Sequence, residues 1–314
     1  MRFLCLLLAC SPLFLCAQST LVEQLGYPKG SKLLIIHADD LGVTHGENAG
    51  SFAGMEHGLV TSGSMMAPCP WLPEVAEWAR RHPDHDLGMH LTLTSEWGPL
   101  KWGPVAGAAR VPSLVDSLGY FHAYCADMAA QAQPEEVKLE LRAQIEQAIG
   151  MGIRPTHLDT HMGCLVYTRP AYFEAYLSLS REYNIPALLG RQELQSAAFA
   201  ALNAFVHPSD LVIDHIYTAT PEDYSGGLAR YYTDVLRHLS PGVSTILIHC
   251  ARNGDESAAA FRGHDNWGAD WRQTDTDFFT ARTTRALLDE LGIRLVTWRE
   301  LNRRWQAYLK GQGR

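Results

Sequence analysis

Short runs of β-branched and apolar residues alternate along this chain with longer segments in which apolar residues recur every three or four positions. The short runs are typical of buried strands, and the longer segments of amphipathic helices. The clearest helix is expected over 135–150, where the apolar residues four positions apart are Val137, Leu141, Ile145 and Ile149. Further helices are expected over 48–57, 72–81, 171–183, 277–291 and from about 299, and strands over 32–37, 59–66, 87–93, 156–159, 185–189, 211–213, 243–249 and 293–296.

The order of these elements, a strand followed by a helix and repeated, favours parallel strands joined by crossover helices. Two α/β architectures have this order, a closed (β/α) barrel and an open doubly wound sheet. We favour a single TIM-like barrel over 18–314, with some distortion. Two long connections, 94–133 and 250–276, lack a clear period and are rich in Gly, Pro, Trp and Asp. Loops that follow strands carry function in such folds, so these connections are candidate walls of a site.

Length and charge narrow the class of function. With 314 residues, 46% of them hydrophobic, the chain is long enough to bury the core of one large domain. Its 26 basic and 34 acidic residues give a net charge of −8, and no run of like charges offers a surface to a phosphate backbone. Nucleic acid is therefore not expected as a partner, and the oligomeric state is left open.

The chain begins with a segment typical of protein export. Residues 1–17 are mostly apolar after one Arg, which predicts a signal peptide, and the apolar stretch is too short for a transmembrane anchor. Cleavage after Ala17 would start the mature protein at Gln18. A lipoprotein signal with Cys10 as the lipidated residue is the alternative. Both interpretations predict a periplasmic or secreted protein.

Four cysteines lie beyond this segment, at Cys69, Cys125, Cys164 and Cys250. They are far apart and form no C-x-x-C pair, which argues against a disulfide-rich scaffold in a chain of this size. An oxidising compartment nevertheless permits one bridge among them.

Acidic residues and histidines gather at the carboxyl ends of the predicted strands, at Asp39, Asp40, His90, His157, His161 and His249. Taken singly, an Asp pair is more often a turn or a helix cap, and a strand histidine more often a core residue. In a parallel barrel, however, all strand ends open on one face, so residues far apart in the chain can converge there. Imidazoles and carboxylates together suit a divalent cation with open positions for water and substrate, which predicts a hydrolytic site. Of His157 and His161, which flank one strand end, we expect only one to face the cation.

Three motifs in this order resemble the YdjC/ChbG family of carbohydrate deacetylases. They are HADDLG at 37–42, GMHLTLT at 88–94 and PTHLDTH at 155–161, and the resemblance covers most of 31–300. It implies a (β/α) barrel related to polysaccharide deacetylases. It also implies a metal-dependent hydrolase that removes acetyl groups from N-acetylated amino sugars or short oligosaccharides.

The resemblance also implies a role for five residues. Asp40, His90 and His161 match the metal ligands, Asp39 matches the general base, and His249 matches the histidine that serves as general acid. Family resemblance favours Mg²⁺ as the divalent metal ion, although such a ligand set also admits Zn²⁺, Mn²⁺ or Co²⁺.

The chain departs from the family pattern at two places. Met162-Gly163 stands where members often carry further histidines, and His249-Cys250-Ala251 stands where they often have His-Pro-Gly. The second departure weakens the assignment of His249. Two alternatives therefore stay open: a non-catalytic carbohydrate-binding barrel, which predicts a broken ligand set, and another metal-dependent hydrolase, such as a phosphoesterase or a different C–N hydrolase.

Several further polar and aromatic residues are weaker candidates. Asp159 is expected either to orient an imidazole or the acidic pair, or to be a turn residue. Arg191 is expected on the surface, or else in contact with substrate or Asp39. The long connections also contain four tryptophans that could stack on a sugar ring or simply pack the loops, Trp97, Trp102, Trp267 and Trp271. His264 and Asp265, in the second connection, are further candidates for the site.

Overall fold

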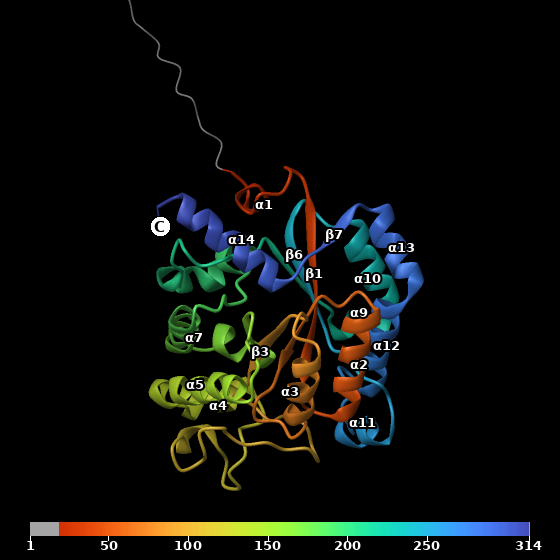
Figure 1. Cartoon of the computed structure of the whole chain (residues 1–314). Helices are drawn as coiled ribbons and strands as arrows, with labels where there is room; N and C mark the ends of the chain where they lie inside the picture. Colours follow the sequence, from red (N-terminus) through yellow and green to blue (C-terminus); the bar gives the residue numbers. More distant parts are fainter. Residues whose placement is uncertain (1–18, 314) are drawn as a thin grey trace, which may run out of the picture.

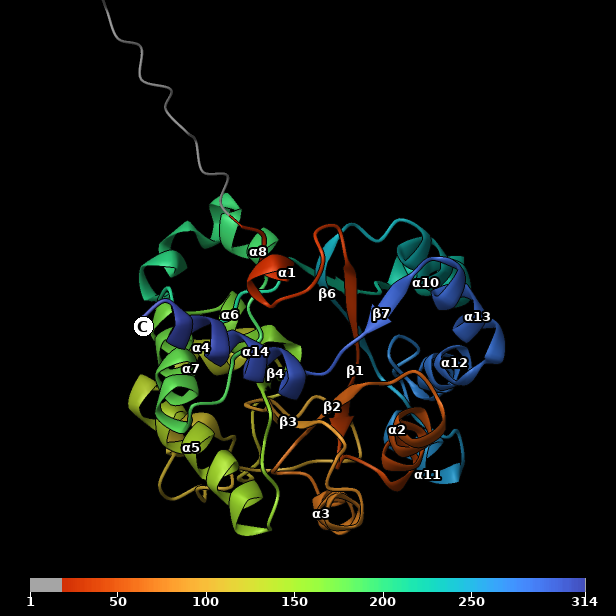
Figure 2. The same cartoon turned by 45° about the horizontal axis from the view of Figure 1, so that its top comes forward.

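The computed structural model describes residues 19–313. Within this range the parallel strands curl into a barrel and the helices surround it (Figures 1 and 2). The predicted signal peptide over 1–17 and the alternative lipidation site Cys10 lie outside the described residues. Across 19–313, every helix falls short of the length and apolar character that a membrane crossing requires.

All paired strands of the sheet are parallel. The strands are β1 (Lys32–Leu41), β2 (Ser62–Met65), β3 (Leu87–Leu91), β4 (Leu158–Thr160), β5 (His215–Thr218), β6 (Gly242–Ile248) and β7 (Ile293–Leu295). They lie side by side in the order β4-β3-β2-β1-β6-β5, and β7 pairs with the first residues of β1.

The gap between β4 and β5 is closed by two isolated pairings rather than by a full strand. Leu158 of β4 pairs with Ala187, and Gly190 pairs with Ile213, just before β5 begins. The segments predicted as strands over 185–189 and 211–213 therefore contribute only single bridges. These pairings complete the ring, so the predicted α/β barrel with parallel strands is confirmed in a distorted form.

Most predicted helices are present. The α-helices are α1 (Leu21–Gln24), α2 (His45–His57), α3 (Leu72–Arg81), α4 (Cys125–Gln131), α5 (Pro134–Gly150), α6 (Cys164–Tyr167), α7 (Pro170–Tyr183), α8 (Arg191–Gln195), α9 (Pro221–Gly226), α10 (Leu228–Arg237), α11 (Asp255–Ala260), α12 (Ala269–Thr280), α13 (Arg282–Glu290) and α14 (Trp298–Gly311). Short 3₁₀ helices are η1 (Pro112–Leu114), η2 (His161–Gly163) and η3 (Ala197–Phe205).

The structure corrects two helix predictions. The single helix expected over 277–291 is two helices, α12 and α13, because Ala281 between them has an extended backbone with ψ of 138°. Helix α10 was not predicted, although Leu228, Tyr232 and Leu236 form the four-residue period of an amphipathic helix and are all buried.

The end of the barrel at which the strands begin is filled by apolar side chains. Helices α1 and α14 lie across this end, so access to the barrel is from the carboxyl ends of the strands (Figures 1 and 2). Members of the apolar cluster that fills it include Leu33, Ile35, Ile213, Val243, Trp298 and Leu301.

Candidate active site

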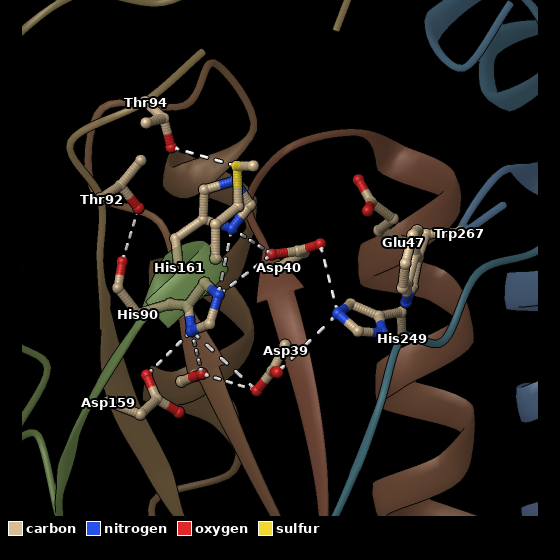
Figure 3. A network of polar contacts seen from close by, with 12 residues as sticks. Asp39, Asp40, Glu47, His90, Thr92, Thr94, Asp159, His161, His249 and Trp267 are labelled. Carbon is tan, nitrogen blue, oxygen red and sulfur yellow. Dashed lines mark hydrogen bonds and ion pairs between the residues drawn. The ribbon is translucent and has the colours of Figure 1, made fainter. Parts of the chain in front are cut away.

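The three residues predicted to hold a cation lie together at the carboxyl ends of the strands (Figure 3). Asp40 Oδ1 lies 3.3 Å from His90 Nε2 and 3.3 Å from His161 Nδ1, and the two nitrogens are 3.2 Å apart. All three side chains are buried. Donor atoms that share one cation through bonds of about 2.0–2.1 Å would have a similar spacing.

The backbone of β1 turns both aspartates toward this cluster. Consecutive side chains of a strand normally point to opposite faces. Asp40, however, has a φ of +66°, and the pairing of β1 with β2 shifts its register between Ala38 and Leu41. This bulge breaks the alternation, and Asp39 and Asp40 both line the same cavity.

His161 faces the cluster, whereas His157 lies beneath it, stacked on Trp298 with ring centroids 5.2 Å apart. The space for the His157 ring depends on Gly88, because a Cβ atom at that position would overlap the imidazole. The Gly of the second motif thus makes room for the first His of the third motif.

A layer of polar contacts below the cluster fixes the orientation of His90. Asp159 Oδ1 lies 2.9 Å from His90 Nδ1, which leaves His90 Nε2 facing Asp40. The other oxygen of Asp159 lies 2.7 Å from His37 Nε2, and His37 Nε2 is also 3.0 Å from Asp39 Oδ1. Asp159 therefore orients an imidazole, as one of its two predicted roles requires, and His37 connects Asp159 to Asp39.

Three charged residues of the site were not predicted from the sequence. Arg272 of α12 lies 2.8 Å from Asp40 Oδ2 and also bonds Glu47 of α2. Glu96, in the connection after β3, has both carboxylate oxygens 3.0 Å from His161 Nε2. Arg272 and Glu96 lie in the two aperiodic connections, where no pattern distinguishes them. For Glu47, the available signal was its place three residues after the helix cap Thr44.

His249 lies at the edge of the cluster. Its Nε2 is 3.8 Å from Asp39 Oδ2 and 4.0 Å from Asp40 Oδ2, so it approaches both carboxylates without a hydrogen bond. Its backbone N–H donates to Asp275 Oδ2 at 2.9 Å, which fixes the end of β6. Burial lowers the pKa of His249 to about 4, against the opposing effect of Asp40 and Asp39, so the imidazole is neutral near pH 7.

The charge of the site favours a bound cation. The carboxylates of the site are those of Asp39, Asp40, Glu96 and Asp159, and the guanidinium of Arg272 opposes them. Burial raises the pKa of Glu47 to about 8, so this residue adds no charge near pH 7. Burial disfavours imidazolium, yet Glu96 and Asp40 raise the pKa of His161 to about 9. Asp40 Oδ1 is buried and lacks a hydrogen-bond partner within the described structure. The ligand set of two imidazoles and a carboxylate therefore fits a divalent metal ion.

A cavity of about 580 Å³ opens above the cluster. Trp97, Trp267 and His264 line it, whereas Trp102 and Trp271 are buried in the core and Asp265 does not take part. Arg191 instead pairs with Asp214, 3.1 Å away, on an exposed face, which agrees with the surface alternative.

One disulfide joins the two segments at the rim of this cavity. Cys125 of α4 is bonded to Cys164 of α6, while Cys69 and Cys250 are free and buried. Cys125 follows Tyr124 and Cys164 follows Gly163, and both neighbours line the cavity. The bridge thus holds the connection after β3 against the segment that carries His161.

Comparisons with known proteins agree with the motifs. A carbohydrate deacetylase from Thermus thermophilus is 33% identical over 289 residues, covering 89% of this chain and 97% of that one. A chitooligosaccharide deacetylase from Yersinia enterocolitica is 31% identical over 167 residues, 52% of this chain and 62% of that one. The crystal structure of a candidate cellobiose-phosphate cleavage protein from Enterococcus faecalis V583 superposes with a TM-score of 0.73 at 26% identity, covering 86% of this chain and 99% of that one. The family model described as YdjC-like protein matches residues 33–290, and the chain belongs to this family.

Proposed function

We propose that this protein is a metal-dependent carbohydrate deacetylase that hydrolyses the amide of an N-acetylated amino sugar or short oligosaccharide. The observation that carries the proposal is the convergence of Asp40, His90 and His161 beside a further carboxylate, that of Asp39, in a cavity large enough for a sugar. The names of the relatives from Thermus thermophilus and Yersinia enterocolitica support the same reaction.

The three clustered residues would hold the metal ion, and Asp39 would act on water. A bound divalent cation would polarise the acetyl carbonyl and lower the pKa of a water molecule. Asp39 lines the cavity and is held through Oδ1 by His37, so its Oδ2 is the oxygen available to accept a proton from the attacking water.

The neutral state of His249 sets the order of proton transfer. Because the pKa of its imidazole is about 4, His249 has no extra proton to donate when the substrate arrives. The proton that Asp39 takes from water would therefore move to His249, whose Nε2 lies 3.8 Å from Asp39 Oδ2 in the absence of substrate. His249 would then protonate the amine nitrogen as the C–N bond breaks, so that acetate and free amine leave.

The alternatives are less well supported by the geometry. A non-catalytic binding barrel predicts a broken ligand set, whereas all three ligand side chains converge. A phosphoesterase would need basic groups for the phosphate. Among the described residues that line the cavity, Arg272 is the one Arg or Lys, and Asp40 and Glu47 already pair with it.

Acetate release tests the proposal. Purified protein, stripped with a chelator and reloaded separately with Mg²⁺, Zn²⁺, Mn²⁺ or Co²⁺, is assayed on N-acetylglucosamine and chitooligosaccharides. Mg²⁺ is the first ion to test on family resemblance, while the two imidazoles also suit Zn²⁺. Asp39→Asn should retain metal and lose acetate release, whereas Asp84→Asn, the same change at an exposed site, should be fully active. If wild type releases no acetate with any ion, the proposal is wrong.

We also propose that the protein acts in the periplasm or outside the cell. The segment 1–17 has the composition of a signal peptide, and the Cys125–Cys164 disulfide suits an oxidising compartment. Mass spectrometry of the protein from fractionated cells tests this. A mature chain that begins at Gln18 is expected, a lipid on Cys10 would identify a lipoprotein, and an uncleaved cytoplasmic chain would refute export.

A further inference from the structure

The cavity above the metal cluster has two chemically different sides. Ionisable side chains line the side at β1, β3 and β6, where Asp39, Asp40, His90 and His249 lie. Apolar side chains line the part around the gap between β4 and β5 and the neighbouring β6, and they include Leu188, Ile216, Leu247, Val166, Phe199 and Leu202. We define these six as the apolar side of the cavity.

Its inner part lies within the barrel. Leu247 of β6 pairs in register with His37 of β1 and with Thr218 of β5. His37 points into the barrel, where it contacts Asp39 and Asp159, so Leu247 on the neighbouring strand points inward as well. Leu247 and Ile216 are nevertheless only partly buried, and both line the cavity, although Ile216 also packs against the apolar cluster at the other end of the barrel.

The hollow lies where the barrel is interrupted. Between β4 and β5 the ring is completed by single bridges at Ala187 and Gly190, and the apolar side begins at Leu188 between them. Leu188 N–H donates to Leu158 O at 2.8 Å, so this side adjoins the strand that carries Asp159. From there it continues outward past Val166 of α6 to Phe199 and Leu202 of η3.

The chemistry of this side restricts what can occupy it. Sugar hydroxyls placed against Leu188, Ile216 and Leu247 would lose water partners, which is unfavourable. The carboxylate of Glu193, which lies near Ile216 at Gly190, offers an acceptor at one point of this lining. An alkyl group would gain by the same burial. Because the apolar side adjoins the cluster at which the amide carbonyl must lie, the group best placed to enter it is the one attached to that carbonyl.

We propose that the apolar side of this cavity binds the N-acyl chain of the substrate, and that the enzyme prefers amino sugars whose acyl group is several carbons longer than acetyl. This inference rests on the proposed amide hydrolysis and specifies its substrate class. Each methylene seated there should raise kcat/KM about fourfold until the apolar side is filled.

The test compares glucosamine carrying N-acetyl, N-butanoyl, N-hexanoyl and N-octanoyl groups, with the released amine measured for all. We expect kcat/KM to rise at least tenfold between N-acetyl and N-hexanoyl. A steady fall from N-acetyl upward would overturn the inference and leave the deacetylase proposal intact, whereas no release from any substrate, N-acetyl included, would refute the deacetylase proposal itself.

Variants of Ile216 and a second ligand test whether the preference for longer acyl chains arises at the apolar side of the cavity. Ile216→Asn places a polar group on the apolar side and should lower the ratio of N-hexanoyl to N-acetyl kcat/KM at least tenfold. Ile149→Asn, the same change at an exposed position on α5, should leave the ratio unchanged. If Ile216→Asn does not fold, Ile216→Ala should lower the ratio in the same direction. Octyl N-acetylglucosaminide carries its alkyl group on the other end of the sugar. If kcat/KM rises above that for N-acetylglucosamine with this compound but not with N-octanoylglucosamine, the apolar side does not bind the N-acyl chain.

Discussion

Arg272 offers the sharpest test of how the site is held together. Its side chain is 1% exposed and lies between two buried acidic residues, with the Asp40 carboxylate at 2.8 Å and the carboxyl group of Glu47 on its other side. Its Nε donates to Trp267 O at 2.6 Å, and the cation lies over the ring of Phe261 at 4.7 Å. Arg272→Met keeps most of the volume and removes the charge and the hydrogen bonds.

The size of the effect follows from burial. Removing one partner of a buried ion pair costs about 3–5 kcal/mol, because the Asp40 carboxylate loses its compensating charge without regaining water. For a chain of 314 residues, whose unfolding entropy is roughly 660 cal/mol/K, such a loss lowers Tm by about 5–8 °C. Asp40 also loses the contact that fixes its second oxygen, so we expect metal affinity to fall about tenfold or more.

Thermal unfolding and metal titration measure the two effects separately. Arg272→Lys keeps the positive charge but lacks the planar guanidinium that can bond two partners at once. Its Tm and its metal affinity should therefore lie between those of wild type and Arg272→Met. Arg262→Met makes the same substitution at an exposed site and should change stability by less than about 0.5 kcal/mol. A Tm for Arg272→Met within about 2 °C of the Arg262→Met value would refute the idea that this buried pair organises the site.

Three further changes have defined outcomes. Burial raises the pKa of Glu47 from 4.5 to about 8, although the charge of Arg272 opposes this shift. Between pH 4.5 and pH 8 the folded protein therefore holds a proton on Glu47 that the unfolded chain has released. Because the folded state binds more protons, the free energy of unfolding falls as pH rises through this range. Glu47→Gln should therefore gain stability relative to wild type between pH 5 and pH 8 in urea unfolding, and a constant difference would contradict this. Replacing Cys125 and Cys164 by Ser opens a loop with a sequence separation of 39 residues and should cost about 2–4 kcal/mol, a difference that disappears when wild type is reduced. Asp159→Asn should weaken metal affinity or activity about 10- to 100-fold, and unchanged values for both would show that His90 needs no such partner.

The sequence predicts those parts of the fold that depend on local pattern. Strand β1 begins with a continuous apolar run because it is buried on both sides. The apolar period of α5 matches its buried face at Val137, Leu141 and Ile145, but the face ends at Ala148, and Ile149 is exposed. The convergence of Asp40, His90 and His161 was also accessible, because parallel topology alone brings strand ends to one face. Their assignment as ligands stays a prediction until metal is measured.

Residues that reach the site through tertiary packing left no local signal. Arg272 enters from α12 and Glu96 from the connection after β3, and neither lies on a predicted strand end. A buried charged residue can be predicted only when its partner is known, and Asp40, which pairs with Arg272, lies 232 positions away in the sequence. Helix α10 is different, because its buried residues Leu228, Tyr232 and Leu236 recur every four positions and this period is present in the sequence.

The weakest strand predictions and the cavity have a common physical cause. A regular barrel fills its interior with layers of inward side chains and leaves no space for a ligand. Here the short apolar runs at 185–189 and 211–213 contribute only isolated bridges, and Leu188 and Ile216 are only partly buried. The irregular backbone that makes this region hard to predict leaves both side chains in the lining of the cavity, beside the cluster. If the sequence formed regular strands in this region, their inward side chains would be expected to fill the cavity.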